Sequence, residues 1–331
     1  MVPRGPALLL LLLLAAPRDG APMPQAQANR TAAPMPPAQA KANRTACATD
    51  GCRPQHPPAH RVMMEEKRLH FAACRAESAL TNGTSGCPTL RPSIHKRAPC
   101  EGGQSGEYAC DNVDLLSYVG MEQLGSTETN DIWGWTDPEH GNEIAIVSLF
   151  DGTAFVDVSE PAAPTVLGKL DTHTFGSDWG DLKVYQDVAY IGSEAQDHGL
   201  QIFVRPSLLP LCIVPGLARL TVAVQDLLSL RELYGKPAPA GTVRNIPEQG
   251  HYDGFGSSHN IVLNEETGFL YAVGSLTCDG GPHILDIRER LEPRFVGCFE
   301  EDGYTHDAEV VVYRGPDEEF VGREIMFACV K

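Results

Sequence analysis

The feature that most constrains the fold is a repeated run of short strands in the second half of the chain. One unit reads FVDVSEP at 155–161 and another reads ILDIR at 284–288, so each contains an apolar strand that ends in an acidic residue. A turn containing proline follows each unit, and we expect a further strand at 165–168 and at 294–297. Four short strands repeated after several tens of residues are typical of β-propeller blades. A β-sandwich is the alternative.

Short runs of Val, Ile, Tyr and Phe between turn residues predict the other strands. Asp151-Gly152 predicts a tight turn with positive φ between strands at 143–149 and 153–158. The remaining expected strands lie at 182–185, 189–192, 260–263, 269–273, 284–287 and 309–313. We therefore predict an all-β domain over 99–331.

The first residues predict export from the cell. Arg4 precedes an apolar run at 7–16 that has the length of a signal-peptide core and is too short to cross a bilayer. We assign 1–28 to a signal peptide, with Ala26-Gln27-Ala28 as one candidate cleavage site. No later apolar run is long enough to span a membrane, so we expect no transmembrane segment in this chain.

Cysteines and glycosylation sequons agree with a secreted or cell-surface location. The chain has 10 cysteines, and sequons begin at Asn29, Asn43 and Asn82. The stretch at 29–59 is rich in Ala and Pro, and it contains a near-copy of the preceding APMPQAQANRTA. This composition predicts a disordered stalk. Apolar residues at helical spacing then predict one short, cysteine-containing helical segment within 60–98.

The charge of the chain limits its partners. A formal net charge of −17 argues against nucleic acid and anionic membranes as partners, because both bind surfaces rich in Lys and Arg. An acidic surface also suits a divalent cation, although more often it serves solubility alone.

Several long strings resemble the choice-of-anchor B family, whose propellers are built from LVIVD-type repeats. They are NDIWGWTDPEHGNEIAIVSLFDGTAFVDVSEPAAPTVLGKLDTHT at 130–174, WGDLKVYQDVAYIGSEAQDHGLQIF at 179–203 and YDGFGSSHNIVLNEETGFLYAVGSLTCDGGPHILDIRERLEPRFVGCFEEDGYTHDAEVVVYRGPD at 252–317, with GEYACDNVDLLSY at 106–118 and GREIMF at 322–327. The resemblance implies a secreted or surface-anchored propeller of four-stranded blades, and it says little about chemistry.

The chain departs from this family at two places. Residues 204–225 (VRPSLLPLCIVPGLARLTVAVQ) separate Phe203 from Asp226, which the resemblance expects to be adjacent. The chain also stops at Lys331 within a blade, where the family would continue. We therefore expect an incomplete propeller that carries an insertion. Our hypothesis for the insertion is a translated intron, and a genuine apolar insertion is the alternative.

The resemblance also matches Cys278 and Cys298, which flank the strand at 284–287. Bridging them closes a loop of about twenty residues, worth on the order of 3 kcal/mol, and we expect this disulfide. Cys100 and Cys110 enclose a Gly-rich segment and are the second expected pair.

Polar residues at the starts of the expected blades are the candidate site. Asp181, His259, His306 and Asp307 precede comparable strands, with His173 as a further candidate. Facing a central channel, they could bind a divalent cation. The alternative is that they hydrogen-bond backbone groups between blades.

Two functions follow from these observations. The first is a non-catalytic recognition module that presents its loops to an extracellular protein or glycan. The second is a metal-dependent hydrolase that uses the channel residues, although no H-E-x-x-H, G-x-S-x-G, P-loop or dinucleotide motif occurs in the sequence. Trp133, Trp135 and Trp179 fit either a carbohydrate contact or aromatic packing between blades, and packing is the simpler interpretation.

The intron hypothesis makes a direct prediction. Amplifying the mature transcript across the codons for Phe203 and Asp226 should give a product that lacks the codons for 204–225. A mature transcript that retains these codons would contradict the hypothesis and favour a genuine insertion.

Overall fold

The computed structural model describes residues 97–330 except 107, 204, 209–221, 226 and 240. The expected signal peptide, stalk and three sequons lie outside the described residues, as does nearly all of the expected helical segment. The described chain is mostly β, as predicted.

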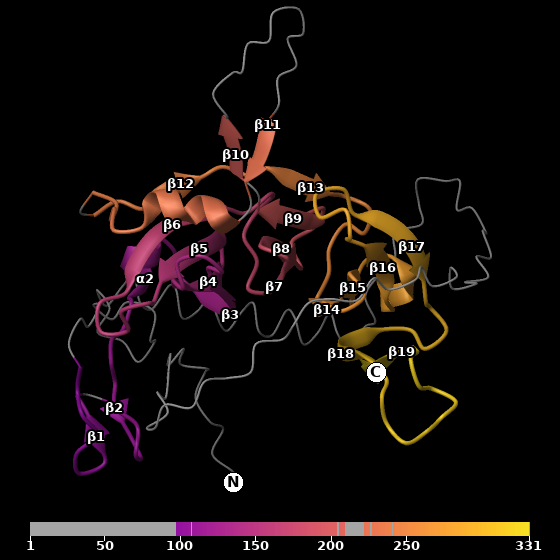
Figure 1. Cartoon of the computed structure of the whole chain (residues 1–331), viewed down its shortest axis with the longest axis horizontal. Helices are drawn as coiled ribbons and strands as arrows, with labels where there is room; N and C mark the ends of the chain where they lie inside the picture. Colours follow the sequence, from indigo (N-terminus) through magenta and orange to yellow (C-terminus); the bar gives the residue numbers. More distant parts are fainter. Residues whose placement is uncertain are drawn as a thin grey trace, which may run out of the picture.

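Three main sheets carry the fold, and they follow one another along the chain (Figure 1). Sheet 1 has the order β12-β6-β5-β4-β3 and consists of β3 (Thr129–Thr136), β4 (Glu143–Leu149), β5 (Gly152–Asp157), β6 (Thr165–Asp171) and β12 (Asn245–Ile246). Sheet 2 has the order β13-β9-β8-β7 and consists of β7 (Gly180–Tyr185), β8 (Val188–Ser193), β9 (Leu200–Phe203) and β13 (Gly250–Tyr252). Sheet 3 consists of β14 (Asn260–Asn264), β15 (Phe269–Val273), β16 (His283–Asp286) and β17 (Arg294–Cys298).

Smaller elements complete the described chain. A fourth sheet pairs β18 (Thr305–Val312) with β19 (Glu324–Val330). The others are β1 (Gln104–Ser105), β2 (Tyr108–Ala109), the helix α2 (Met121–Leu124), β10 (Arg205–Leu208), β11 (Val222–Gln225) and the 3₁₀ helices η2 (Leu227–Leu233) and η3 (Cys278–Gly280). All pairs within the sheets are antiparallel except β12 with β6.

The first strands of successive sheets lie next to one another. β3 contacts β7, β7 contacts β14, and β14 contacts β18. Figure 1 shows the sheets spread from these strands as an arc, with the last strands β12, β13 and β17 on the opposite side. Within the described residues this arc does not close into a ring.

Apolar side chains fill the spaces between neighbouring sheets. The Phe155 and Phe203 rings, 4.4 Å apart between centroids, lie in the core between sheets 1 and 2. Tyr190 and Phe255 belong to the core between sheets 2 and 3, and Val310 of β18 joins the apolar face of sheet 3. Sheet 1 is covered by sheet 2 on one face and by α2 and the residues before it on the other, so β4 is buried without alternation from Ile144 to Leu149. Removing this apolar area from water is the main stabilising contribution.

The connection from β9 to β13 returns to sheet 1 before it completes sheet 2. Leu227 and Leu230 of η2 pack into the core between sheets 1 and 2, and β12 then pairs with β6. The chain finally adds β13 to the edge of β9. This excursion makes the fourth strand of sheet 2 distant in sequence from the third, which the repeat pattern did not predict.

The segment 204–225 contains an antiparallel strand pair. Arg205 lies opposite Gln225, so the two ends of the segment are neighbours (Figure 1). The chain resumes at once in η2, where the Leu227 amide donates to the Asp187 carbonyl over 2.7 Å. The core elements on either side therefore meet near the base of the β10–β11 pair.

The predicted hairpin between β4 and β5 is confirmed, and its turn lies one residue earlier than predicted. Leu149 pairs with Gly152, so the turn residues are Phe150 and Asp151, and neither has a positive φ. Gly152 already belongs to β5, where a Cβ would lie 2.2 Å from the Leu170 carbonyl oxygen. The close approach of β6 and the positive φ of 158° are therefore the physical reasons for glycine at this position.

We expect Gly152→Ala to lower the free energy of unfolding by about 1–3 kcal/mol, because the added methyl group must displace the backbone of β6. Gly134→Ala in β3 is the matched control, since its Cβ would meet nothing within 4 Å. Urea unfolding of both variants measures the difference. Equal stability of the two variants would contradict the explanation.

Candidate functional site

Polar side chains at the starts of the first strands connect each sheet to the next. The Leu182 amide donates to Asp131 Oδ2 over 3.2 Å, and the Ile261 amide donates to Asp181 Oδ2 over 2.8 Å. Asn260 continues the series, because its Nδ2 donates to the His306 carbonyl over 3.0 Å. These contacts are backbone hydrogen bonds between neighbouring sheets, of the kind that the sequence allowed as an alternative to a ligand site.

Asp181 is 6% exposed, and both of its carboxylate oxygens accept hydrogen bonds. Oδ1 accepts from the Leu182 amide at 2.8 Å and from Lys183 Nζ at 2.5 Å. Burial raises the pKa of Asp181 to about 6, the Lys183 ammonium opposes that rise, and the nearby Asp131 adds to it. Asp181 is therefore engaged in joining sheets 2 and 3.

His259 and His306 meet at the rim of these first strands. Their Nε2 atoms are 3.0 Å apart, and their ring centroids are 4.3 Å apart. His259 Nδ1 also contacts Glu194 Oε1, just beyond the end of β8. His259 is 6% exposed, and the Trp179 ring lies 6.0 Å from it between centroids. Sheets 2, 3 and 4 thus each contribute one residue to this cluster.

The other two candidates lie apart from that pair. Asp307 is exposed, and its Oδ1 accepts from the adjacent Ala308 amide at 2.8 Å. His173 follows β6, where Nδ1 lies 2.8 Å from both oxygens of Glu248 and its ring stacks on His251 at 3.6 Å between centroids. The structure therefore brings together His259 and His306, and it gives His173 a different carboxylate partner.

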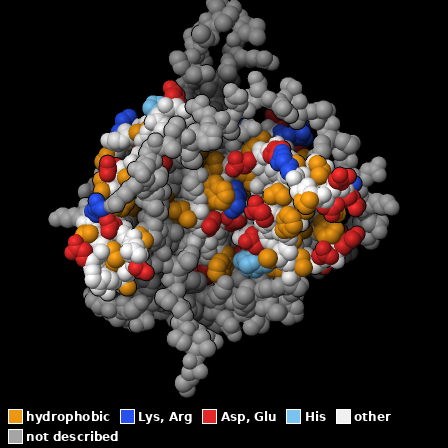
Figure 2. Space-filling model, turned by 60° about the horizontal axis from the view of Figure 1, so that its bottom comes forward, with side chains coloured by type: hydrophobic (Ala, Val, Ile, Leu, Met, Phe, Trp, Pro, Cys, Tyr) orange, Lys and Arg blue, Asp and Glu red, His pale blue; other side chains and the backbone are white. Residues whose placement is uncertain are grey.

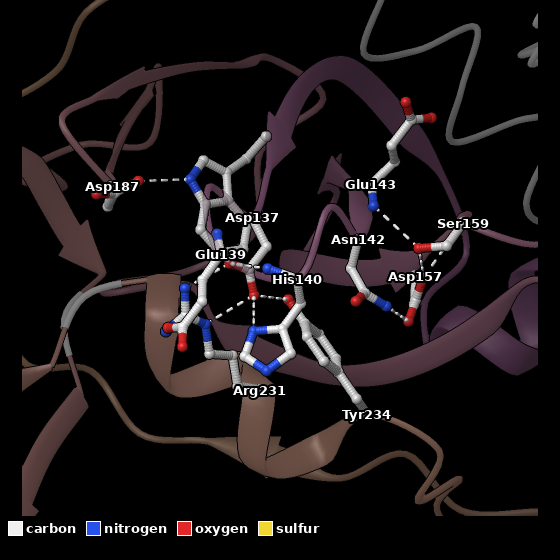
Figure 3. Close-up of polar contacts among 11 residues, drawn as sticks. Asp137, Glu139, His140, Asn142, Glu143, Asp157, Ser159, Asp187, Arg231 and Tyr234 are labelled. Atoms are coloured by element: carbon white, nitrogen blue, oxygen red, sulfur yellow. Dashed lines mark hydrogen bonds and ion pairs between the residues drawn. The ribbon is translucent and has the colours of Figure 1, made fainter.

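A buried carboxylate anchors the returning segment to sheet 1 (Figure 3). Asp137 follows β3, its side chain is buried, and Arg231 of η2 donates to both of its oxygens. The Tyr234 hydroxyl and the backbone amides of Glu139 and His140 also donate to it. The Arg231 guanidinium holds the pKa of Asp137 well below its usual range. Every group in this cluster serves the junction of η2 with sheet 1.

The tryptophans support packing between sheets more than a sugar surface. Trp135 is buried, and its Nε1 donates to Asp187 Oδ1 of the β7–β8 turn at 2.8 Å (Figure 3). Trp133 is partly buried against the same core, with Lys183 Nζ 4.6 Å from its ring centroid.

Two disulfides are formed, Cys100–Cys110 and Cys278–Cys298. His283 lies close to the second pair, and its ring nitrogens contact the Tyr252 and Thr277 hydroxyls at 3.0 and 2.9 Å. Burial lowers the pKa of His283 to about 4. Because the sulfurs are bonded to each other, this group is structural. Cys329 is an exposed free thiol.

Sequence reasoning missed Asp131, Glu194 and Arg231. Aligning Asn130-Asp131-Ile132 with Gly180-Asp181-Leu182 would have identified Asp131, since both triplets start a first strand. Glu194 and Arg231 occupy connections with no repeat signal, so their contacts depend on the packing of distant segments.

Comparison with known proteins gives no family assignment. No protein-family model matches the chain, and no curated protein matches it. The resemblance to the choice-of-anchor B family stays a prediction from the quoted strings. In the described part of the chain, no helix combines the length and apolar character needed to cross a membrane.

We expect Asp181→Asn to remove a pH dependence of stability between about pH 4 and pH 6. The folded pKa is about 6, whereas an unfolded aspartate titrates near about 3.9. In this window the folded state holds a proton that the unfolded state lacks, so stability falls as pH rises, by up to about 3 kcal/mol. Urea unfolding at several pH values should show this as a difference between native protein and variant. A constant difference across the window would contradict it.

Proposed function

We propose that this protein is a secreted, non-catalytic recognition module built on a β-propeller. Successive antiparallel sheets with adjacent first strands support the blade interpretation, because propeller blades pack in that order around an axis. The two disulfides fit an oxidising, extracellular compartment. The choice-of-anchor B resemblance implies the same fold and location.

The observation that carries the recognition function is an open apolar surface at the C-terminal sheets. Of the 11 large hydrophobic residues that are exposed in the described chain, nine lie between 291 and 330. We call the following set the open C-terminal surface: Phe299, Val311, Phe320, Val321, Phe327 and Val330. A concentration of exposed large apolar side chains in one part of the chain is typical of protein-interaction sites.

The β19 edge gives this surface a mode of binding. Each of the earlier second strands, β4, β8 and β15, pairs with a strand on both sides. Within the described residues β19 pairs with β18 alone. An extended segment of a partner could therefore add to this edge by β-augmentation.

The charges around the surface indicate the chemistry of that partner. Exposed acidic runs at 300–302 and 317–319 flank it, and Asp307 and Glu309 lie on β18. Figure 2 shows acidic and apolar side chains intermixed over this part of the molecule. We propose a protein partner with an extended segment that combines apolar and basic side chains, because the opposite charges would attract it.

The hydrolase alternative receives less support from the geometry. Its expected ligand set was Asp181, His259, His306 and Asp307. Both carboxylate oxygens of Asp181 accept hydrogen bonds from groups of sheets 2 and 3. Asp307 lies on the exposed side of β18. Recognition is therefore the function that we propose.

A synthetic peptide of alternating lysine and valine tests the surface. We expect it to bind the protein, and Phe327→Lys to weaken binding at least about tenfold, because a like charge would meet the peptide's lysines at the edge strand. Phe175→Lys is the matched control, since Phe175 is 62% exposed and Phe327 is 59% exposed. Fluorescence anisotropy of the labelled peptide measures both affinities.

Salt and backbone methylation separate this mode from simple charge attraction. Added salt should weaken binding by screening, and peptide N-methylation should abolish it by removing the edge hydrogen bonds. Equal losses in the two lysine variants, or full binding of the methylated peptide, would contradict the proposal.

A further inference from the structure

The cluster of Glu194, His259 and His306 has the arrangement of a metal-binding histidine pair. Each side chain comes from a different sheet, and the two Nε2 atoms point at each other across 3.0 Å. Two nitrogens bound to one Zn²⁺ at about 2.0–2.1 Å each would lie at a similar or slightly larger separation. A small outward movement of one ring would therefore admit an ion between them.

Glu194 sets which nitrogen of His259 is available. Its carboxylate contacts Nδ1, and because an ionised carboxylate only accepts hydrogen bonds, Nδ1 carries the hydrogen and donates it. In a neutral imidazole the lone pair then lies on Nε2, which faces His306. A carboxylate that holds the remote N–H of a histidine is the usual support of a metal ligand.

The surroundings hold the pair in position. Asn260 Nδ2 donates to the His306 carbonyl, which fixes the backbone of β18 against β14. His259 is buried beside the Trp179 ring, so its ring has little freedom to turn away. His306 lies on β18 and His259 directly precedes β14, so the backbone of both ligands is positioned in advance of binding.

We propose that His259 and His306 bind a divalent transition-metal ion of the Zn²⁺ class through their Nε2 atoms, with Glu194 as the positioning residue. Imidazole nitrogens select Zn²⁺, Cu²⁺ or Ni²⁺ over Mg²⁺ and Ca²⁺, which prefer oxygen ligands. The proton between the two rings moves to His306 Nδ1 or to solvent when the ion binds. Two protein ligands leave coordination positions for water or for a donor group from a partner. The inference does not depend on the open C-terminal surface.

Titration of the secreted full chain with ZnCl₂ by calorimetry tests the site. We expect His306→Ala to weaken one Zn²⁺ site at least about hundredfold, and Glu194→Gln to weaken it by about 10- to 100-fold while leaving both ligands in place. The matched control is His173→Ala. It removes a histidine whose Nδ1 is also held by a carboxylate, that of Glu248, and that lies apart from the His259–His306 pair. It should leave this Zn²⁺ site unchanged.

Nitrogen NMR of labelled imidazoles identifies the ligand atoms directly. Zn²⁺ should shift the Nε2 signals of His259 and His306, and Mg²⁺ should not. If His306→Ala fails to fold, Glu194→Gln and the Nε2 shifts decide the matter. Absence of Zn²⁺ binding at about 100 µM would overturn the proposal. So would Zn²⁺ binding that is as tight in Glu194→Gln as in the native protein and that shifts neither Nε2 signal.

Discussion

The hydrogen bond from a first-strand carboxylate to the backbone of the next sheet is the contact on which the arrangement of sheets depends. Sheets stacked face to face share apolar side chains, and that packing alone permits sliding because it has little directionality. The Asp131 and Asp181 carboxylates fix the offset, since each accepts from one defined amide in the neighbouring first strand. Asp181 remains buried because Lys183 and two amides compensate for its desolvation.

This constraint also places the histidine pair. Ile261 is held by Asp181, and His259 precedes it by two residues at the rim of sheet 3. Asn260 in turn holds the backbone at His306 in sheet 4. The two imidazoles therefore face each other because the same contacts that join the sheets set the positions of their strands. The proposed metal site and a structural junction therefore share one set of backbone positions.

The two ends of the arc differ in how far their outer faces are covered. On sheet 1, α2 and the residues before it cover the outer face, where Leu124 packs with Val147 and Val156. The C-terminal sheet has no comparable cover among the described residues, and most of the exposed large apolar side chains gather there. Repeat-built folds need such covers at their ends, and the exposed apolar side chains of the C-terminal sheet are the basis of the proposed recognition surface.

The sequence by itself determined the β-rich class and the positions of most strands, because strand periodicity and turn residues are local signals. The family resemblance pointed to Cys278–Cys298, and the Gly-rich loop pointed to Cys100–Cys110; both disulfides are formed. The sequence also identified His259 and His306 as comparable strand starts. Only the tertiary structure decided that Glu194 supports His259, that Asp181 joins two sheets and that Arg231 anchors η2 to Asp137. These contacts join residues 65, 80 and 94 positions apart, respectively. No local pattern encodes them, since each depends on how whole sheets and the returning segment pack.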